Sequence, residues 1–128
     1  DMKYAITLLV SLFALLAPQT AALAQTEKTA DDYKVVVDEV RDGVRFVEAT
    51  MSETVCSTEF KVEINVGDKT IQKAVLVRGC PGNGTAVCKL LEGMTVDEAV
   101  KRLKGTPCGK RVSSCPDQMA RILSSLKW

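Results

Sequence analysis

The residues best able to do chemistry in this 128-residue chain are five cysteines, and the sequence contains no histidine. The missing histidine removes the commonest general base at neutral pH and the commonest metal ligand. Ser-His-Asp triads, Cys-His pairs and His-containing zinc sites are therefore excluded from this chain. A soft-metal site would have to use thiolates, and acid–base chemistry would have to use Asp, Glu, Lys or Cys.

Four of the cysteines fall in predicted loops or at the ends of predicted elements. Cys56 precedes a strand, Cys108 lies in a loop, and Cys80 and Cys115 each stand directly before a proline at a helix start. The spacing is C-x23-C-x27-C-x6-C. It contains no C-x-x-C, so zinc-ribbon, rubredoxin-like and thioredoxin motifs are absent. The two Cys-Pro helix starts favour a metal or redox role, because a helix N-terminus stabilises a thiolate.

The fifth cysteine, Cys88, differs from these four. It lies inside a predicted helix beside Val87, Leu90 and Leu91. Free cysteine at such a position behaves as a small buried hydrophobe. We therefore expect Cys88 to be neither a metal ligand nor a disulfide partner.

Four basic residues lie close in sequence to the loop cysteines: Arg78, Lys104, Lys110 and Arg111. Four thiolates around a divalent cation leave two negative charges uncompensated, and these side chains could offset them. The alternative is that they are ordinary solvated surface. The sequence leaves both interpretations open.

Residues 33–40 and 44–50 are rich in β-branched side chains and flank Asp42-Gly43. This pattern predicts a β-hairpin. The competing interpretation is one amphipathic helix through Val36, Val40, Val44 and Val47. We favour the hairpin because Gly43 would weaken a helix at that point.

Downstream, residues 60–66 alternate between apolar and polar side chains, which predicts a strand with one buried face, and 71–78 return as a more apolar strand. The spacing of apolar residues then changes to the 3.6-residue period of helices. Helices are predicted over 83–91, 95–105 and 116–126. A capping box of Thr95 and Glu98 opens the second, and Pro116 is predicted at the first position of the third. The predicted class is α+β: a small antiparallel sheet of three to four strands followed by three short helices packed on one face.

The N-terminal residues 1–24 are predicted to be a secretory signal peptide. Lys3 precedes the apolar run 5–16, and Ala22-Leu23-Ala24 is an A-x-A cleavage signal before Gln25. The run is shorter than the ~20 residues that span a bilayer, so no stable membrane anchor is expected after cleavage. Residues 25–54 are then expected to be a disordered start plus the hairpin, as an extension of a four-cysteine domain over 55–128. The predicted location is periplasmic or secreted.

The charge balance argues against one class of partner. Seventeen Lys and Arg face sixteen Asp and Glu, giving a net charge of +1. Such a chain has no electrostatic reason to bind nucleic acid.

Several short motifs resemble the TSCPD domain family. They are GCPGN at 79–83, LEGM at 91–94, LKG at 103–105, CG at 108–109 and SCPDQ at 114–118. The similarity extends over about residues 55–126. Ser113 stands where the naming motif has Thr, and Cys88 is additional to the family's four cysteines.

The resemblance implies that Cys56, Cys80, Cys108 and Cys115 bind a metal, with zinc as the expected ion. Relatives occur as small stand-alone proteins and at the C-terminus of B12-dependent ribonucleotide reductases, which implies a cytoplasmic setting and an association with deoxyribonucleotide synthesis. It implies no reaction for the stand-alone form, so we expect a non-catalytic module with a protein partner of unknown identity. Whether the chain is an enzyme is left open.

Export would make two other roles for the cysteines competitive. Disulfides Cys108–Cys115 and Cys56–Cys80 could staple an exported structural or interaction domain, because oxidising compartments favour such bonds. A thiol–disulfide relay could instead use Cys115 as the attacking thiolate and Cys108 as its resolving partner.

Overall fold

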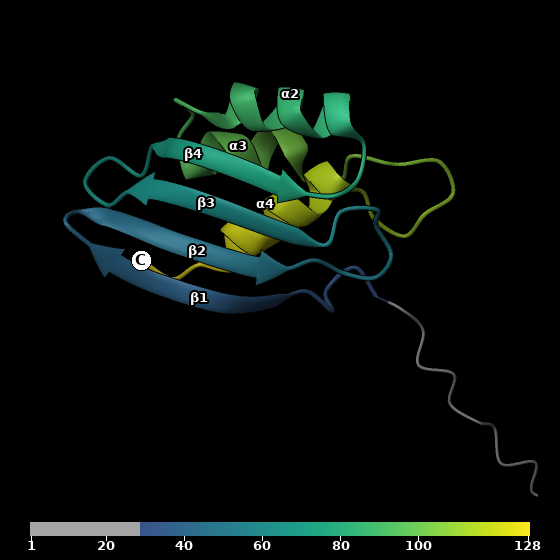
Figure 1. Cartoon of the computed structure of the whole chain (residues 1–128), viewed down its shortest axis with the longest axis horizontal. Coiled ribbons are helices and arrows are strands. Elements are labelled where there is room, and N and C mark those ends of the chain that lie inside the picture. The colour runs from purple at the N-terminus through teal and green to yellow at the C-terminus, as the bar shows by residue number, and fades with distance from the viewer. Residues whose placement is uncertain (1–28) are drawn as a thin grey trace, which may run out of the picture.

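The computed structural model describes residues 29–128, and the predicted signal peptide lies outside them. A four-stranded antiparallel sheet precedes three helices, which confirms the predicted α+β class (Figure 1). The strands are β1 (Lys34–Arg41), β2 (Val44–Thr50), β3 (Glu59–Asn65) and β4 (Ile71–Val77). The helices are α2 (Pro81–Leu91), α3 (Val96–Leu103) and α4 (Cys115–Ser125).

The predicted hairpin is confirmed, and its strands belong to the main sheet, whose order is β1-β2-β3-β4. Asp42 and Gly43 form its two-residue turn with φ values of 50° and 75°. Positive φ at both positions is what a tight hairpin of this kind requires, and Asp-Gly tolerates it well. The competing helix through the valines does not form.

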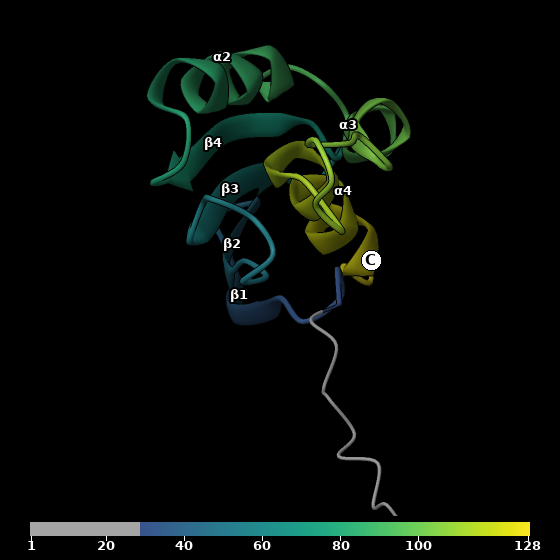
Figure 2. The ribbon, with the colours of Figure 1, turned by 90° about the vertical axis from the view of Figure 1, so that its right-hand side faces the viewer.

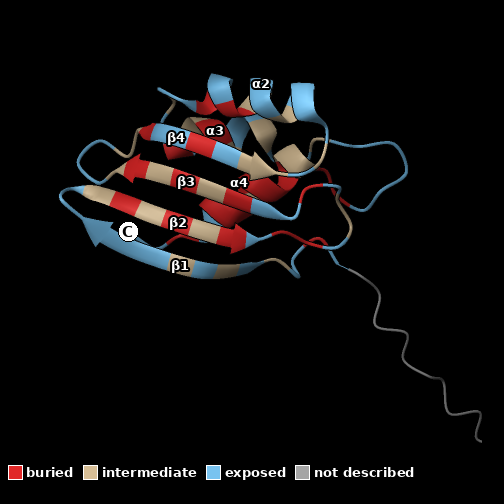
Figure 3. Cartoon of the chain, in the orientation of Figure 1, coloured by how far each residue is buried: buried red, intermediate tan, exposed pale blue. Residues whose placement is uncertain are grey.

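The inner face of the sheet carries the core. Val47 on β2 lies opposite Val62 on β3, and both are buried. Buried positions recur along β2 and β3 (Figure 3). Helix α4 crosses this face, α2 lies along β4, and α3 lies beside α4 (Figure 2). The largest fully buried apolar side chains come from both layers: Phe60, Ile64, Ile71, Leu91, Met119, Ile122 and Leu123.

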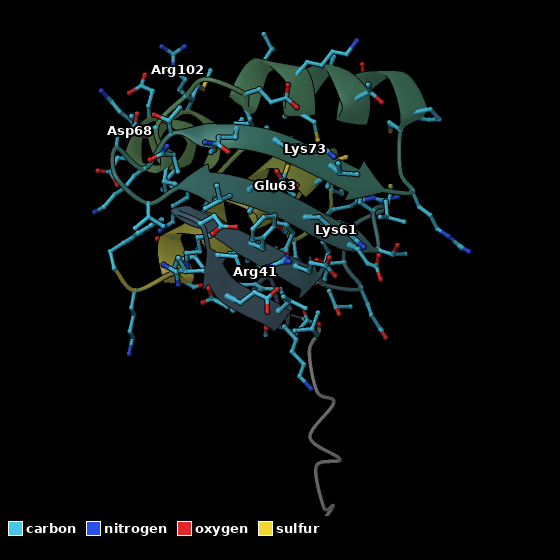
Figure 4. All side chains as sticks on the ribbon, turned by 60° about the vertical axis from the view of Figure 1, so that its left-hand side comes forward. Arg41, Lys61, Glu63, Asp68, Lys73 and Arg102 are labelled. Carbon is cyan, nitrogen blue, oxygen red and sulfur yellow. The ribbon has the colours of Figure 1, made fainter. Side chains whose placement is uncertain are left out.

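The outer face of the sheet is charged. Lys61 and Glu63 on β3 and Lys73 on β4 stand on it, and Arg41 lies on the edge strand β1 (Figure 4). Lys61 Nζ lies 3.6 Å from the Glu48 carboxylate across the β2–β3 pair. Alternation between a buried and a charged face is typical of an antiparallel sheet with one solvated side.

The helix starts differ from the sequence predictions in three details. Helix α2 begins at Pro81, two residues before the predicted start at 83. The Thr95 hydroxyl accepts from the backbone N–H of Glu98 at 3.3 Å, but the Glu98 carboxylate accepts from Arg102 Nε at 2.6 Å. The predicted reciprocal half of the capping box is therefore replaced by an i,i+4 ion pair. Helix α4 begins at Cys115 itself, with Ser114 as its N-cap, so Pro116 takes the second position. No helix within 29–128 is long and apolar enough to cross a membrane.

Candidate functional site

One cavity of about 190 Å³ has all four predicted ligand cysteines in its lining. Cys56 comes from the β2–β3 loop, Cys80 from the β4–α2 turn and Cys108 from the α3–α4 loop, while Cys115 is the first residue of α4. The fold thus gathers chemically similar side chains from four places in the sequence. Cys88 does not line this cavity.

The walls between the cysteines are mostly apolar, formed by Leu76, Val87, Pro107 and Pro116. A low-dielectric wall strengthens any electrostatic interaction inside the cavity. Cys56, Cys80 and Cys108 are exposed, so water compensates part of any charge on them, and polar partners on the apolar side of the cavity add to that compensation.

Two of the four sulfurs have such partners. Arg111 Nη1 donates to Cys56 Sγ at 2.9 Å. The single proton of the Ser57 hydroxyl is within reach of two acceptors, Cys115 Sγ at 3.1 Å and the Arg78 carbonyl at 3.2 Å. Of the four basic residues near the cysteines in sequence, Arg111 is thus the one that hydrogen-bonds a cysteine sulfur. Ser57 was not predicted, and its only signal was its place beside Cys56.

Helix N-termini also compensate negative charge on the cysteine sulfurs. Cys80 is the N-cap of α2, and its carbonyl accepts from the backbone N–H of Gly84 at 2.8 Å. Cys115 occupies the first position of α4. The positive end of each helix dipole therefore faces a cysteine, and such ends stabilise negative charge.

The donor set fits a zinc site in its chemistry, because four cysteine thiolates are a common set of ligands in structural zinc sites. Within residues 29–128, however, no three Cys, Asp or Glu side chains are already grouped around one point as metal ligands. Binding would therefore require the cysteine side chains to rotate, or the α3–α4 loop to close over the cavity.

Gly79 gives the Ser57 hydroxyl the space it needs beside Cys115. Gly79 has φ +92°, and a Cβ atom at this position would overlap Ser57 Oγ. Gly79→Ala should therefore combine backbone strain with a clash that displaces Ser57, at a total cost of about 1–3 kcal/mol in unfolding free energy. Urea unfolding measures this cost.

Gly93→Ala is the matched control for Gly79→Ala. Gly93 has a similar φ of +95°, but a Cβ atom added there would have no other atom within 4 Å beyond its immediate neighbours. This variant should feel the backbone strain alone and lose less stability. Equal losses in the two variants would contradict a steric role for Gly79 against Ser57.

The acidic residue of the naming motif, Asp117, is structural. Its carboxylate is 2% exposed and accepts from Gly105 N at 2.7 Å, Ser113 Oγ at 2.5 Å and Arg121 Nε at 2.8 Å. Burial by itself raises the pKa of Asp117, but these hydrogen bonds and the Arg121 charge outweigh it and hold the pKa below its usual value. Asp117 therefore fixes both ends of the loop that carries Cys108.

The next residue of the motif, Gln118, joins distant segments. Its Oε1 accepts from Ser52 N at 3.1 Å, and its Nε2 donates to Ala30 O at 2.5 Å and to Ser113 Oγ at 3.1 Å. Arg121 adds an ion pair with Asp31 at 2.7 Å. The motif thus anchors the segment before β1 as well as the cysteine loop.

Cys88 is buried within α2, as predicted, and is 5% exposed. Burial raises the pKa of the Cys88 thiol, which keeps it protonated and unsuited to bind a cation. None of the five cysteines forms a disulfide in the structure.

Comparison with known families matches residues 31–127 to the TSCPD domain. The match includes the β1–β2 hairpin, which agrees with the place of those strands in the main sheet. No curated protein and no solved structure matches the chain. Because the family match covers most of its length and its motifs agree, this chain belongs to the TSCPD domain family.

Proposed function

We propose that this protein is a non-catalytic metal-binding module in which Cys56, Cys80, Cys108 and Cys115 bind one zinc ion. The observation that carries the proposal is that all four side chains line a single cavity. Zinc takes four thiolates in tetrahedral structural sites, and its binding energy contributes directly to folding. When bound, it would cross-link the loops that meet at the cavity.

The surroundings of three of the four sulfurs, those of Cys56, Cys80 and Cys115, support a thiolate site. The Arg111 and Ser57 hydrogen bonds and the two helix N-termini all favour negative charge on sulfur. Hydrogen-bonded outer partners of this kind orient and stabilise metal ligands in proteins.

A non-catalytic role is supported by the composition of the cavity. Among the described residues, its lining includes no Asp, Glu or Lys, and the chain has no histidine. A reaction that needs a general acid or base would therefore have only the cysteines to use.

The partner and location are proposed on separate grounds, and they exclude each other. The resemblance to TSCPD domains at the C-terminus of ribonucleotide reductases supports a protein partner in ribonucleotide reduction for a chain that stays in the cytoplasm. The apolar run and A-x-A signal before Gln25 support export to the periplasm or outside the cell. In an exported protein, disulfides Cys108–Cys115 and Cys56–Cys80 compete with metal for the same thiols, which makes a stapled structural domain the second candidate.

Elemental analysis and intact mass on the same sample separate these candidates. Full-length protein is purified without chelators, and its metal content and alkylated mass are measured with and without reductant. One zinc per chain supports the proposal. Two disulfides with little metal in protein from its native compartment support the stapled domain, and a zinc content far below one per chain in fully reduced protein refutes the zinc site.

A further inference from the structure

The α3–α4 loop carries both Cys108 and Arg111 on one tight turn. The backbone N–H of Arg111 donates to the carbonyl of Cys108 at 3.2 Å, and Gly109 inside the turn has φ +59°. The positions of these two residues are therefore coupled, so a contact that holds one of them also restrains the other.

Arg111 uses that position to reach a different loop. Its guanidinium donates to Cys56 Sγ at 2.9 Å, across 55 positions in the sequence. Hydrogen bonds in which the donor or the acceptor is charged are about twice as strong as neutral ones, and Arg111 is a charged donor. The contact thus joins the turn that carries Cys108 to the β2–β3 loop that carries Cys56. Both cysteines are proposed zinc ligands.

Arg111 also matches the charge of the proposed centre. Four thiolates and one divalent cation leave two negative charges uncompensated in a cavity with apolar walls. The Ser57 hydroxyl is neutral, whereas a guanidinium keeps its positive charge at all physiological pH values.

From this geometry we propose that Arg111 is a positioning residue of the cysteine centre: it brings Cys108 and Cys56 together and offsets the negative charge of the thiolates. The inference rests on the proposed zinc function and names a residue that sets the affinity of that site. Arg111 is exposed, so it has little part in the core.

Zinc affinity, measured by competition with a chromophoric chelator, tests this role in the reduced full-length chain. Arg111→Met should weaken zinc binding about 10–100-fold, the usual cost of losing an outer partner of a metal ligand. Arg111→Lys, which keeps the charge but loses the planar fork, should recover part of that loss. Stoichiometry should stay at one zinc per chain, and the melting temperature of the metal-free variants should match that of wild type.

Lys110→Met is the matched control, because it removes a neighbouring exposed cation from the same turn. It should change zinc affinity by no more than about 2-fold, as expected for a screened surface charge. Arg111→Met with wild-type affinity would overturn the inference, and so would equal losses in Arg111→Met and Lys110→Met. Failure of reduced wild type to bind zinc would refute the proposed function and this inference with it, an outcome distinct from a failure confined to the variants.

Discussion

Replacing Cys108 by alanine is expected to abolish tight zinc binding while leaving the metal-free fold intact. Cys108 is exposed on the α3–α4 loop, so its removal takes nothing from the core. Losing one of four thiolates should weaken binding by more than the ~10–100-fold that an outer partner costs. The stabilisation that zinc gives, about 2.7 kcal/mol at 100 times Kd, should disappear with it. A metal assay and thermal melts with and without zinc measure both effects.

Cys88→Ala is the control for this experiment, and it should behave in the opposite way. Cys88 is buried in α2 and contributes to the core cluster. Its truncation should lower the unfolding free energy by about 1–2 kcal/mol, by analogy with other core truncations, equally with and without zinc. Zinc content should stay at one per chain.

These two variants check the assignment of the cysteines as well as the metal. Zinc binding that survives Cys108→Ala but is lost in Cys88→Ala would show that the assignment is wrong. Loss in both variants, with the metal-free fold intact, would point to five interacting thiols and contradict the separate role of Cys88.

Asp117→Asn is expected to destabilise the protein by about 2–4 kcal/mol at neutral pH, because it removes the negative charge beside Arg121 and leaves at least one donor without its acceptor. The carboxylate accepts from three donors, Gly105 N–H, the Ser113 hydroxyl and Arg121 Nε. Oδ1 serves Gly105, and Oδ2 serves both Ser113 and Arg121, so the NH2 group of asparagine must face either the Gly105 N–H or the other two donors. Urea unfolding at pH 7 measures the loss.

The difference in unfolding free energy between wild type and Asp117→Asn should depend on pH with a definite sign. The pKa of Asp117 is lowered in the folded protein, so its contribution is fully present above the unfolded value of about 4 and is lost as pH falls through the folded pKa. Asparagine does not titrate. The difference in unfolding free energy between wild type and Asp117→Asn should therefore become smaller when unfolding is repeated at about pH 3.

Glu98→Gln is the control for Asp117→Asn. Its ion pair with Arg102 is on the surface, where such pairs contribute little. It should cost far less than Asp117→Asn at neutral pH. If Asp117→Asn lowers the unfolding free energy equally at neutral and acidic pH, the ionised, hydrogen-bonded carboxylate of Asp117 is not the source of this stabilisation.

Local sequence patterns determined the elements of this fold. Asp42-Gly43 between two β-branched runs specified the hairpin, because the turn needs positive φ and those residues adopt it. Alternation in 60–66 specified the buried face of β3. The prolines after Cys80 and Cys115 marked the starts of α2 and α4, since proline fits the first turn of a helix. Helical periodicity also separated the buried Cys88 from the cysteines at element ends.

Tertiary structure alone decided the environment of the site. The hydrogen bond from Arg111 to Cys56 spans 55 positions, and that from Ser57 to Cys115 spans 58. No local pattern encodes such pairs, because they depend on how the loops meet after the sheet and α4 have packed. Proximity in sequence left Arg111 indistinguishable from Lys110.

The same holds for the motif that follows Cys115. Its sequence marks a helix start, but the burial of Asp117 against Gly105 and the contact of Gln118 with Ala30 arise only when α4 lies across the sheet. Neighbouring residues determined where each element begins and ends, since backbone conformation is a local preference. Packing determined which side chains share the cavity, since that depends on contacts between segments far apart in the chain.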